Sequence, residues 1–143
     1  MPSSTSPTPG EFTILAAGAV ALVSSFLDFY TFGDTGANVW SSGLFPLAAL
    51  MVIFVVLMAF QISLTRFAHM EITSRPFGFT WLQIHLALAF FATVNAVAFL
   101  LTRPPFGTSR GIGFWGILVA CVAALFGAVL LQREGAGRAG PNY

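Results

Sequence analysis

Four long runs of apolar residues alternate with shorter polar stretches along the chain. The runs cover residues 12–30, 44–64, 79–101 and 113–131 and contain 19, 21, 23 and 19 residues. As helices they would be about 28 to 35 Å long, which matches the hydrocarbon core of a bilayer. They lack the strict apolar–polar alternation of membrane β-strands. The pattern therefore predicts an all-α fold, a bundle of four transmembrane helices.

The composition agrees with a membrane protein. Hydrophobic residues make up 57% of the 143 positions and charged residues 8%, whereas an average soluble domain has about 25% charged residues. Within the four runs, Asp28 is the one charged side chain. A net charge of +1 is too small for the basic surface that nucleic acids require, so we expect no nucleic-acid partner. We expect a multi-pass protein of the cell membrane whose first partner is the lipid bilayer.

The two ends of the chain differ in composition from the predicted bundle, residues 12–131. Residues 1–11 are rich in Pro, Ser and Thr and contain no Lys or Arg, and residues 132–143 are rich in Gly. Neither stretch can bury an apolar core, so both are predicted to be flexible tails. The first run has no basic flank and no small-residue cleavage site, so it is predicted to be a retained helix and not a signal peptide.

Arginine sets the predicted orientation, because the chain has no lysine. With four spans, both tails lie on the same side as the connection between the second and third helices. Four arginines belong to that side: Arg66, Arg75, Arg133 and Arg138. The opposite side has two, Arg103 and Arg110. Because positive residues concentrate in cytoplasmic loops, the count predicts that both termini are cytoplasmic.

Small residues recur at a spacing of four in two of the runs. The members in the last run are Gly116, Ala120, Ala124 and Ala128. The first run has Ala17, Ala21 and Ser25 at the same spacing. Such stripes let two helix backbones approach closely in lipid. We expect these two helices to pack against each other, as ordinary bundle packing, or against a second copy.

Polar residues inside the runs fall into two layers separated by an apolar middle. One layer lies near the predicted cytoplasmic side and contains His85, Gln61 and Gln83. Because intramembrane polar groups need partners, we expect a neutral His85 that is hydrogen-bonded to these glutamines. The apolar middle argues against a path for protons or ions through one copy.

The second polar layer lies near the predicted outer side. It contains Ser25, Asp28, Asn95 and Arg103. In the third run, Asn95 and His85 are predicted to share one face that points into the bundle. Arg103 is the nearest opposite charge to Asp28 in the predicted topology, so an ion pair between the first and third helices is expected.

Catalytic and metal-binding patterns are absent from the sequence. One cysteine, Cys121, and two histidines cannot form the usual zinc or iron–sulfur sites. A b-type haem on His85 would need a second axial ligand, and the other histidine, His69, belongs to a connection. The triplet Asp34-Thr35-Gly36 has no second copy, so it is interpreted as a turn and not as an aspartic-protease motif. We expect no catalytic, cofactor-binding or metal-ligating residues.

Four strings at the ends of the runs have a familiar pattern. They are SFLDFY at 25–30, WSSGLFPL at 40–47, GFTWLQIH at 78–85 and GIGFW at 111–115. Together they resemble small four-helix integral membrane proteins of unknown function that are common in actinobacteria. The resemblance implies a four-helix topology and a membrane location, and it implies no particular reaction.

Three classes of function are compatible with these features. The first is a non-enzymatic accessory or scaffold subunit of a cell-envelope complex, as a homo-oligomer or with a larger membrane-protein partner. The second is a component of a small transporter or channel, which would need several copies to enclose a pore. The third is a membrane redox enzyme with b-type haem, or a lipid-modifying enzyme, that uses His85 or Asp28.

Overall fold

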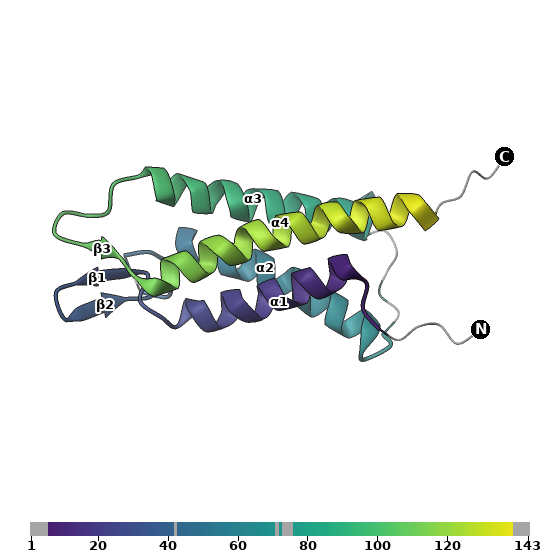
Figure 1. The fold of residues 1–143 in the computed structure, drawn as a ribbon, viewed down its shortest axis with the longest axis horizontal. Helices are drawn as coiled ribbons and strands as arrows, with labels where there is room; N and C mark the ends of the chain where they lie inside the picture. Colours follow the sequence, from purple (N-terminus) through teal and green to yellow (C-terminus); the bar gives the residue numbers. More distant parts are fainter. Residues whose placement is uncertain (1–5, 42, 71, 73–75, 139–143) are drawn as a thin grey trace.

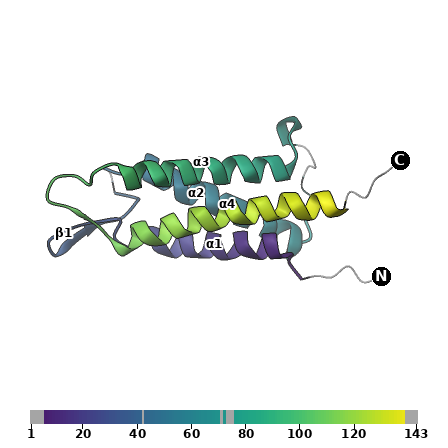
Figure 2. The same ribbon diagram turned by 45° about the horizontal axis from the view of Figure 1, so that its top comes forward.

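The computed structural model describes residues 6–41, 43–70, 72 and 76–138. Over this part of the chain, four helices run up and down a long bundle whose one end is closed by a small sheet (Figure 1). The helices are α1 (Pro9–Ser25), α2 (Leu47–Arg66), α3 (Trp81–Leu101) and α4 (Ile112–Arg138), with the 3₁₀ turn η1 (Pro76–Gly78) before α3. The sheet marks the "sheet end" of the bundle. At the opposite "termini end", α1 begins and α4 ends (Figure 2).

Three short antiparallel strands form the sheet in the order β2-β1-β3. They are β1 (Tyr30–Phe32), β2 (Thr35–Ala37) and β3 (Ser109–Arg110). Phe32 pairs with Thr35 across a two-residue turn. Gly33, the first residue of that turn, has a φ of +53°, a conformation that a glycine adopts without strain.

The predicted first helix, residues 12–30, is wrong at both ends. In the structure α1 spans Pro9–Ser25, and the chain then turns through Phe26 and Leu27, whose amides donate to the carbonyls of Val23 and Ser24. Next, the Phe29 amide donates to the Ala37 carbonyl at 2.8 Å. The apolar run continues past the helix because Phe29 and Tyr30 are buried in the core, while Phe26 and Leu27 are exposed.

Three of the helices, α2, α3 and α4, are long and apolar enough to cross a membrane. The 17 residues of α1 correspond to about 25 Å, shorter than a typical span. The predicted helical bundle is therefore confirmed, together with three candidate spans.

The predicted flexible tails are partly wrong. Thr8 and Glu11 form a capping box at the start of α1, so residues 8–11 belong to an ordered helix start. At the other terminus, α4 continues seven residues beyond the predicted end at Leu131 and stops at Arg138. The rest of the predicted tails, residues 1–5 and 139–143, lies outside the described residues.

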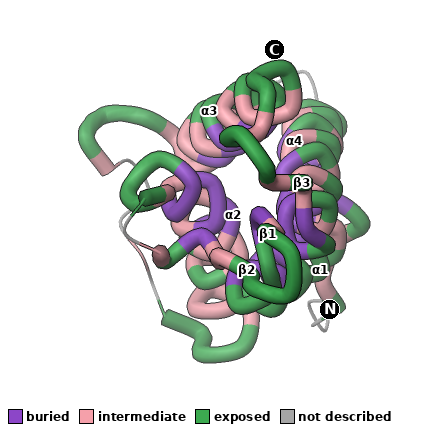
Figure 3. The backbone as a smooth tube through the Cα atoms, turned by 90° about the vertical axis from the view of Figure 1, so that its left-hand side faces the viewer, coloured by how far each residue is buried: buried purple, intermediate pink, exposed green. Residues whose placement is uncertain are grey.

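Small residues bring α1 and α4 together, and these two helices make the most extensive contact in the bundle. A Cβ atom on Gly116 of α4 would collide with the Ser24 side chain of α1. Ala120, Ala124 and Ala128 are buried in the core. Seen from the sheet end, buried segments line the interior and exposed segments form the outside of the bundle (Figure 3). The packing of α1 against α4 is the one that the small-residue stripes predict.

Candidate functional site

Backbone contacts hold the sheet end together around Asp28. Its carbonyl accepts a hydrogen bond from the Gly113 amide, and the Phe29 carbonyl accepts one from the Gly111 amide, both at 2.9 Å. A Cβ atom at Gly111 would collide with the Asp28 carbonyl, and one at Gly36 would collide with the Asp28 carboxylate. Glycine is required at Gly111, where the obstructing atoms belong to the backbone, whereas at Gly36 the exposed Asp28 carboxylate could move aside.

An aromatic cluster fills the interior beside this crossing. The ring of Phe29 meets those of Tyr30, Phe99 and Phe114 at centroid distances of 5.1, 5.4 and 5.2 Å, all nearly perpendicular. Edge-to-face pairs of this kind stabilise a core beyond the area that they bury. Burial raises the pKa of Tyr30, and the positive charge of Arg110 lowers it to a smaller extent.

Arg110 closes the C-terminal end of α3. Its Nη2 donates to the carbonyls of Leu100 and Thr102 at 2.6 and 2.9 Å, and its guanidinium carbon lies 5.4 Å from the centre of the Phe114 ring. A cation at this end of a helix also interacts favourably with the helix dipole. Sequence reasoning missed this role, since Arg110 lies nine residues beyond Leu101 and no local pattern connects them.

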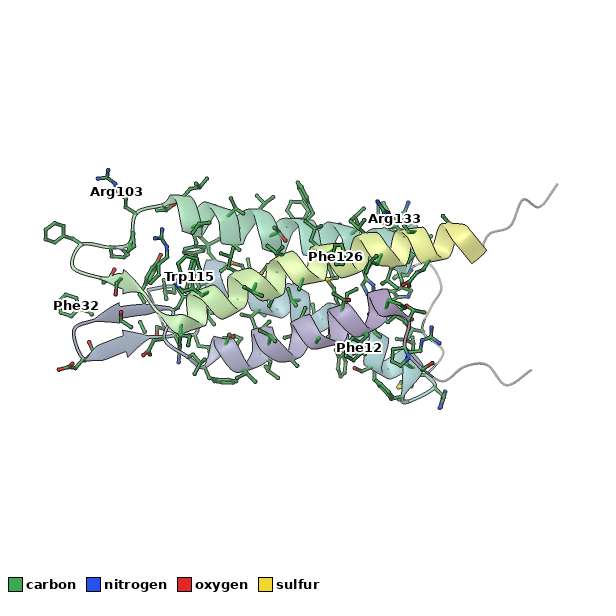
Figure 4. The ribbon with its side chains drawn as sticks, viewed as in Figure 1. Phe12, Phe32, Arg103, Trp115, Phe126 and Arg133 are labelled. Carbon is green, nitrogen blue, oxygen red and sulfur yellow. The ribbon has the colours of Figure 1, made fainter. Side chains whose placement is uncertain are left out.

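The expected ion pair between Asp28 and Arg103 is wrong. Arg103 is exposed at the sheet end (Figure 4) and forms no ion pair or hydrogen bond with a described residue, while the Asp28 carboxylate lies against Gly36. Ser25 is buried, and its hydroxyl donates to the carbonyl of Leu22 at 2.6 Å. The Asp28 side chain is exposed, so its charge needs no ion-pair partner.

The inward face of α3 differs from the predicted one. Its buried residues are His85, Ala89, Ala92 and Ala96. Asn95 lies at the flank of this stripe, where its Nδ2 donates to the Leu47 carbonyl at the start of α2, at 2.8 Å. The predicted shared face of His85 and Asn95 is therefore wrong. The prediction assumed the 3.5-residue period of a coiled coil, and the straighter helix drifts away from it over ten residues.

Side-chain contacts join the helices at the termini end. Arg66 of α2 pairs with Glu11 of α1, with Nη2 and Oε1 2.9 Å apart, and its Nε donates to both carboxylate oxygens at 2.9 Å. Glu134 of α4 accepts from the Gly10 amide at 3.0 Å. Sequence reasoning missed both contacts. The Thr-x-x-Glu pattern is typical of a capping box and could have indicated the capping role of Glu11. No local pattern indicates its pairing with Arg66.

His85 is the most deeply buried ionisable side chain of this end. It is 3% exposed, and neither ring nitrogen has a hydrogen-bond partner within the part of the chain that the structure describes. Its ring centre lies 6.2 Å from that of Trp81, and both residues line a pocket of about 340 Å³ together with Gln61. The expected hydrogen bonds from His85 to Gln61 and Gln83 are wrong, because Gln83 instead forms a capping box with Thr80 at the start of α3.

Two further pockets lie between α2 and α3 at the sheet end. The first, of about 420 Å³, includes Tyr30, Asn95, Thr102 and Arg103 in its wall. The second, of about 520 Å³, shares Asn95 with the first and extends along α2 and α3 toward the middle of the bundle. The sheet end therefore combines exposed polar groups with an adjoining apolar groove.

Among the described residues, no group of three His, Cys, Asp or Glu side chains could hold a metal ion. Cys121 is buried, and its carbonyl accepts a hydrogen bond from the Thr93 hydroxyl at 3.0 Å. The hydroxyl thereby joins α3 to α4.

No protein-family model, no curated protein and no solved structure matches this chain. The resemblance to small four-helix actinobacterial membrane proteins stays a prediction from the sequence, and the function has to be argued from the geometry.

Proposed function

We propose that the protein is a non-enzymatic integral membrane protein that serves as an accessory or scaffold subunit of a cell-envelope complex. The observation that carries this proposal is the uncovered apolar face of α3. Of the residues in the most apolar 18-residue stretch of each helix, 22% are buried in α3, whereas 39% are buried in α2 and 44% in α4. Phe90 and Val97 are exposed on α3. A face of this kind needs lipid or another helix to cover it.

In the proposed topology all four helices cross the bilayer, the short α1 packed along α4, and the termini end faces the cytoplasm. The distribution of positive charge supports this orientation. Arg66, Arg133 and the end of α4 at Arg138 belong to the termini end, and Arg103 and Arg110 to the sheet end. Arg75, which the sequence analysis assigned to the same side as the termini, lies outside the described residues.

Cysteine labelling tests the orientation in a background in which Cys121 is replaced by Ser. Ser41→Cys lies after the sheet and Ala68→Cys lies just after α2, and the latter residue is exposed. A membrane-impermeant reagent added to intact cells should label Ser41→Cys, and should reach Ala68→Cys after the membrane is opened. Labelling of Ala68→Cys alone in intact cells would invert the topology.

Photo-crosslinking tests the accessory role in native membranes. A benzoylphenylalanine at Phe90 on α3 is compared with one at Phe126 on α4, which is an equally exposed phenylalanine of a different helix. We expect position 90 to give one stoichiometric protein adduct and position 126 to give mainly lipid adducts. Identical adducts at both positions, or no protein adduct at position 90, would contradict the accessory role.

A membrane redox enzyme with b-type haem is the second candidate, and it is favoured by the buried ring of His85, whose nitrogens have no hydrogen-bond partner among the described residues. An imidazole nitrogen can ligate haem iron directly. The visible spectrum of the purified protein separates the candidates. A Soret band that disappears in His85→Gln while the protein stays folded would favour the redox candidate and contradict the non-enzymatic proposal.

A further inference from the structure

The two pockets between α2 and α3 form one continuous groove. They share Leu47, Asn95 and Ala98 in their walls, and their volumes are about 420 and 520 Å³. Leu47 and Ala98 are exposed, so the groove opens to the outside of the bundle. It begins beside the sheet and continues along half of each helix, to Phe54 on α2 and Phe91 on α3.

The chemistry of the groove changes along its length. The section next to the sheet is lined by the polar side chains of Tyr30, Thr102 and Arg103, and the section toward the middle of the bundle is lined by apolar ones such as Phe54 and Val94. The groove therefore matches a ligand whose polar head lies next to the sheet and whose apolar tail extends toward the middle of the bundle.

Arg103 is the available cation of this groove. Its guanidinium is exposed and has no ion pair or hydrogen bond within the described part of the chain, whereas the guanidinium of Arg110 is occupied by carbonyls at the end of α3. Arg103 lies two residues beyond Leu101, the last residue of α3. In a spanning helix this position is at the level of the lipid headgroups, where arginine can bind a phosphate through two donors.

We propose that the groove binds a single anionic phospholipid. The phosphate lies at Arg103, in the section of the groove whose wall also contains Tyr30, and an acyl chain lies along the apolar section between α2 and α3. This proposal rests on the membrane insertion proposed above. A partner helix fits less well, because the groove covers only half the length of α3 and ends in a cation.

Native mass spectrometry of the full-length protein in a neutral detergent tests the proposal. The probes are phosphatidylglycerol and phosphatidylcholine with identical acyl chains. We expect the wild type to retain phosphatidylglycerol more tightly. Arg103→Gln should weaken that binding at least tenfold and remove the preference between the two lipids. Ala98→Phe, which places a ring inside the groove, should weaken the binding of both.

Two matched variants serve as controls, and thermal unfolding verifies that every variant is folded. Arg133→Gln removes an exposed arginine at the termini end (Figure 4), and Ala87→Phe adds a ring to an exposed position of α3 outside the groove. Both should bind lipid as the wild type does. Equal loss in Arg103→Gln and Arg133→Gln, or full binding in Arg103→Gln, would overturn the proposal.

Flotation with liposomes distinguishes the failure of this inference from the failure of membrane insertion. A protein that floats with the liposomes after an alkaline wash, yet shows no effect of Arg103→Gln, would contradict the lipid site alone. A protein that does not float would contradict the proposed function itself.

Discussion

The two ends of the bundle are held together by different kinds of contact. At the sheet end, backbone amides donate to backbone carbonyls, and Gly111 and Gly113 stand where a Cβ atom would collide with backbone. At the termini end, Arg66 and Glu11 join the helices through long side chains, and the nitrogens of the buried His85 ring have no hydrogen-bond partner among the described residues. Backbone crossings tolerate almost no added atoms, whereas side-chain contacts can rearrange. The two ends should therefore differ in their sensitivity to substitution.

The largest difference is expected from glycine substitutions at the sheet end. Gly111→Ala would drive a Cβ atom into the Asp28 carbonyl. This overpacking should cost about 3 kcal/mol of stability. Gly43→Ala is the control, because an added Cβ there has no atom within 4 Å. The apparent Tm in detergent should fall strongly for the first variant and little for the second. Similar shifts would remove the distinction between the ends.

Substitution of one arginine at each end gives the next comparison. Arg110→Gln removes donors to the carbonyls of Leu100 and Thr102 and the contact with Phe114, at a cost of about 1.5 to 3 kcal/mol. Arg66→Gln removes a partly exposed ion pair with Glu11, for which about 1 kcal/mol is expected. Denaturant unfolding of both variants measures the difference. A larger loss in Arg66→Gln would mean that the side-chain contacts dominate.

The sequence predicts the positions of three helices well and the sheet end poorly, for a physical reason. Residues 44–64, 79–101 and 113–131 were predicted as helices, and α2, α3 and the start of α4 lie within three residues of those bounds. Such spans depend on local apolarity, which each segment carries by itself. The sheet depends on the pairing of Tyr30 with Arg110, which is 80 positions away in the sequence. In addition, the hydropathy of Phe29 does not reveal whether lipid or protein surrounds its side chain.

The polar sites show the same limit. The partner of Glu11 is Arg66, which is 55 residues away in the sequence and so cannot be inferred from a local pattern. On α3, the inward face drifts around the helix, so Asn95 lies outside the buried stripe that contains His85. The capping boxes at Thr8 and Thr80 were not predicted, although their signal lies within four residues and a local pattern could have revealed them.

Opposite effects are expected when one polar side chain of α3 at each end is replaced by leucine. His85→Leu removes two buried nitrogens that have no partner, so stability should stay constant or rise by about 1 kcal/mol. Asn95→Leu removes a hydrogen bond to the Leu47 carbonyl and should cost about 1 kcal/mol. Thermal unfolding in the same detergent compares them. A clear loss in His85→Leu would show that the ring has a partner in the membrane, such as water or a ligand.

The smallest expected effect is a pH dependence that belongs to the sheet end alone. Burial raises the pKa of Tyr30 above its ordinary value of 10.0. The unfolded chain therefore releases this proton at lower pH than the folded protein does. The contribution of Tyr30 to stability is complete below pH 10 and decreases as the pH rises above it. The apparent Tm of the wild type should fall as the pH rises above 10, and Tyr30→Phe should remove this part of the fall. Tyr143, the other tyrosine, is present in both proteins and cancels in the comparison. If both proteins lost stability in parallel, the phenol of Tyr30 would be as accessible as that of a free tyrosine, and the sheet end would be more open than its backbone contacts indicate.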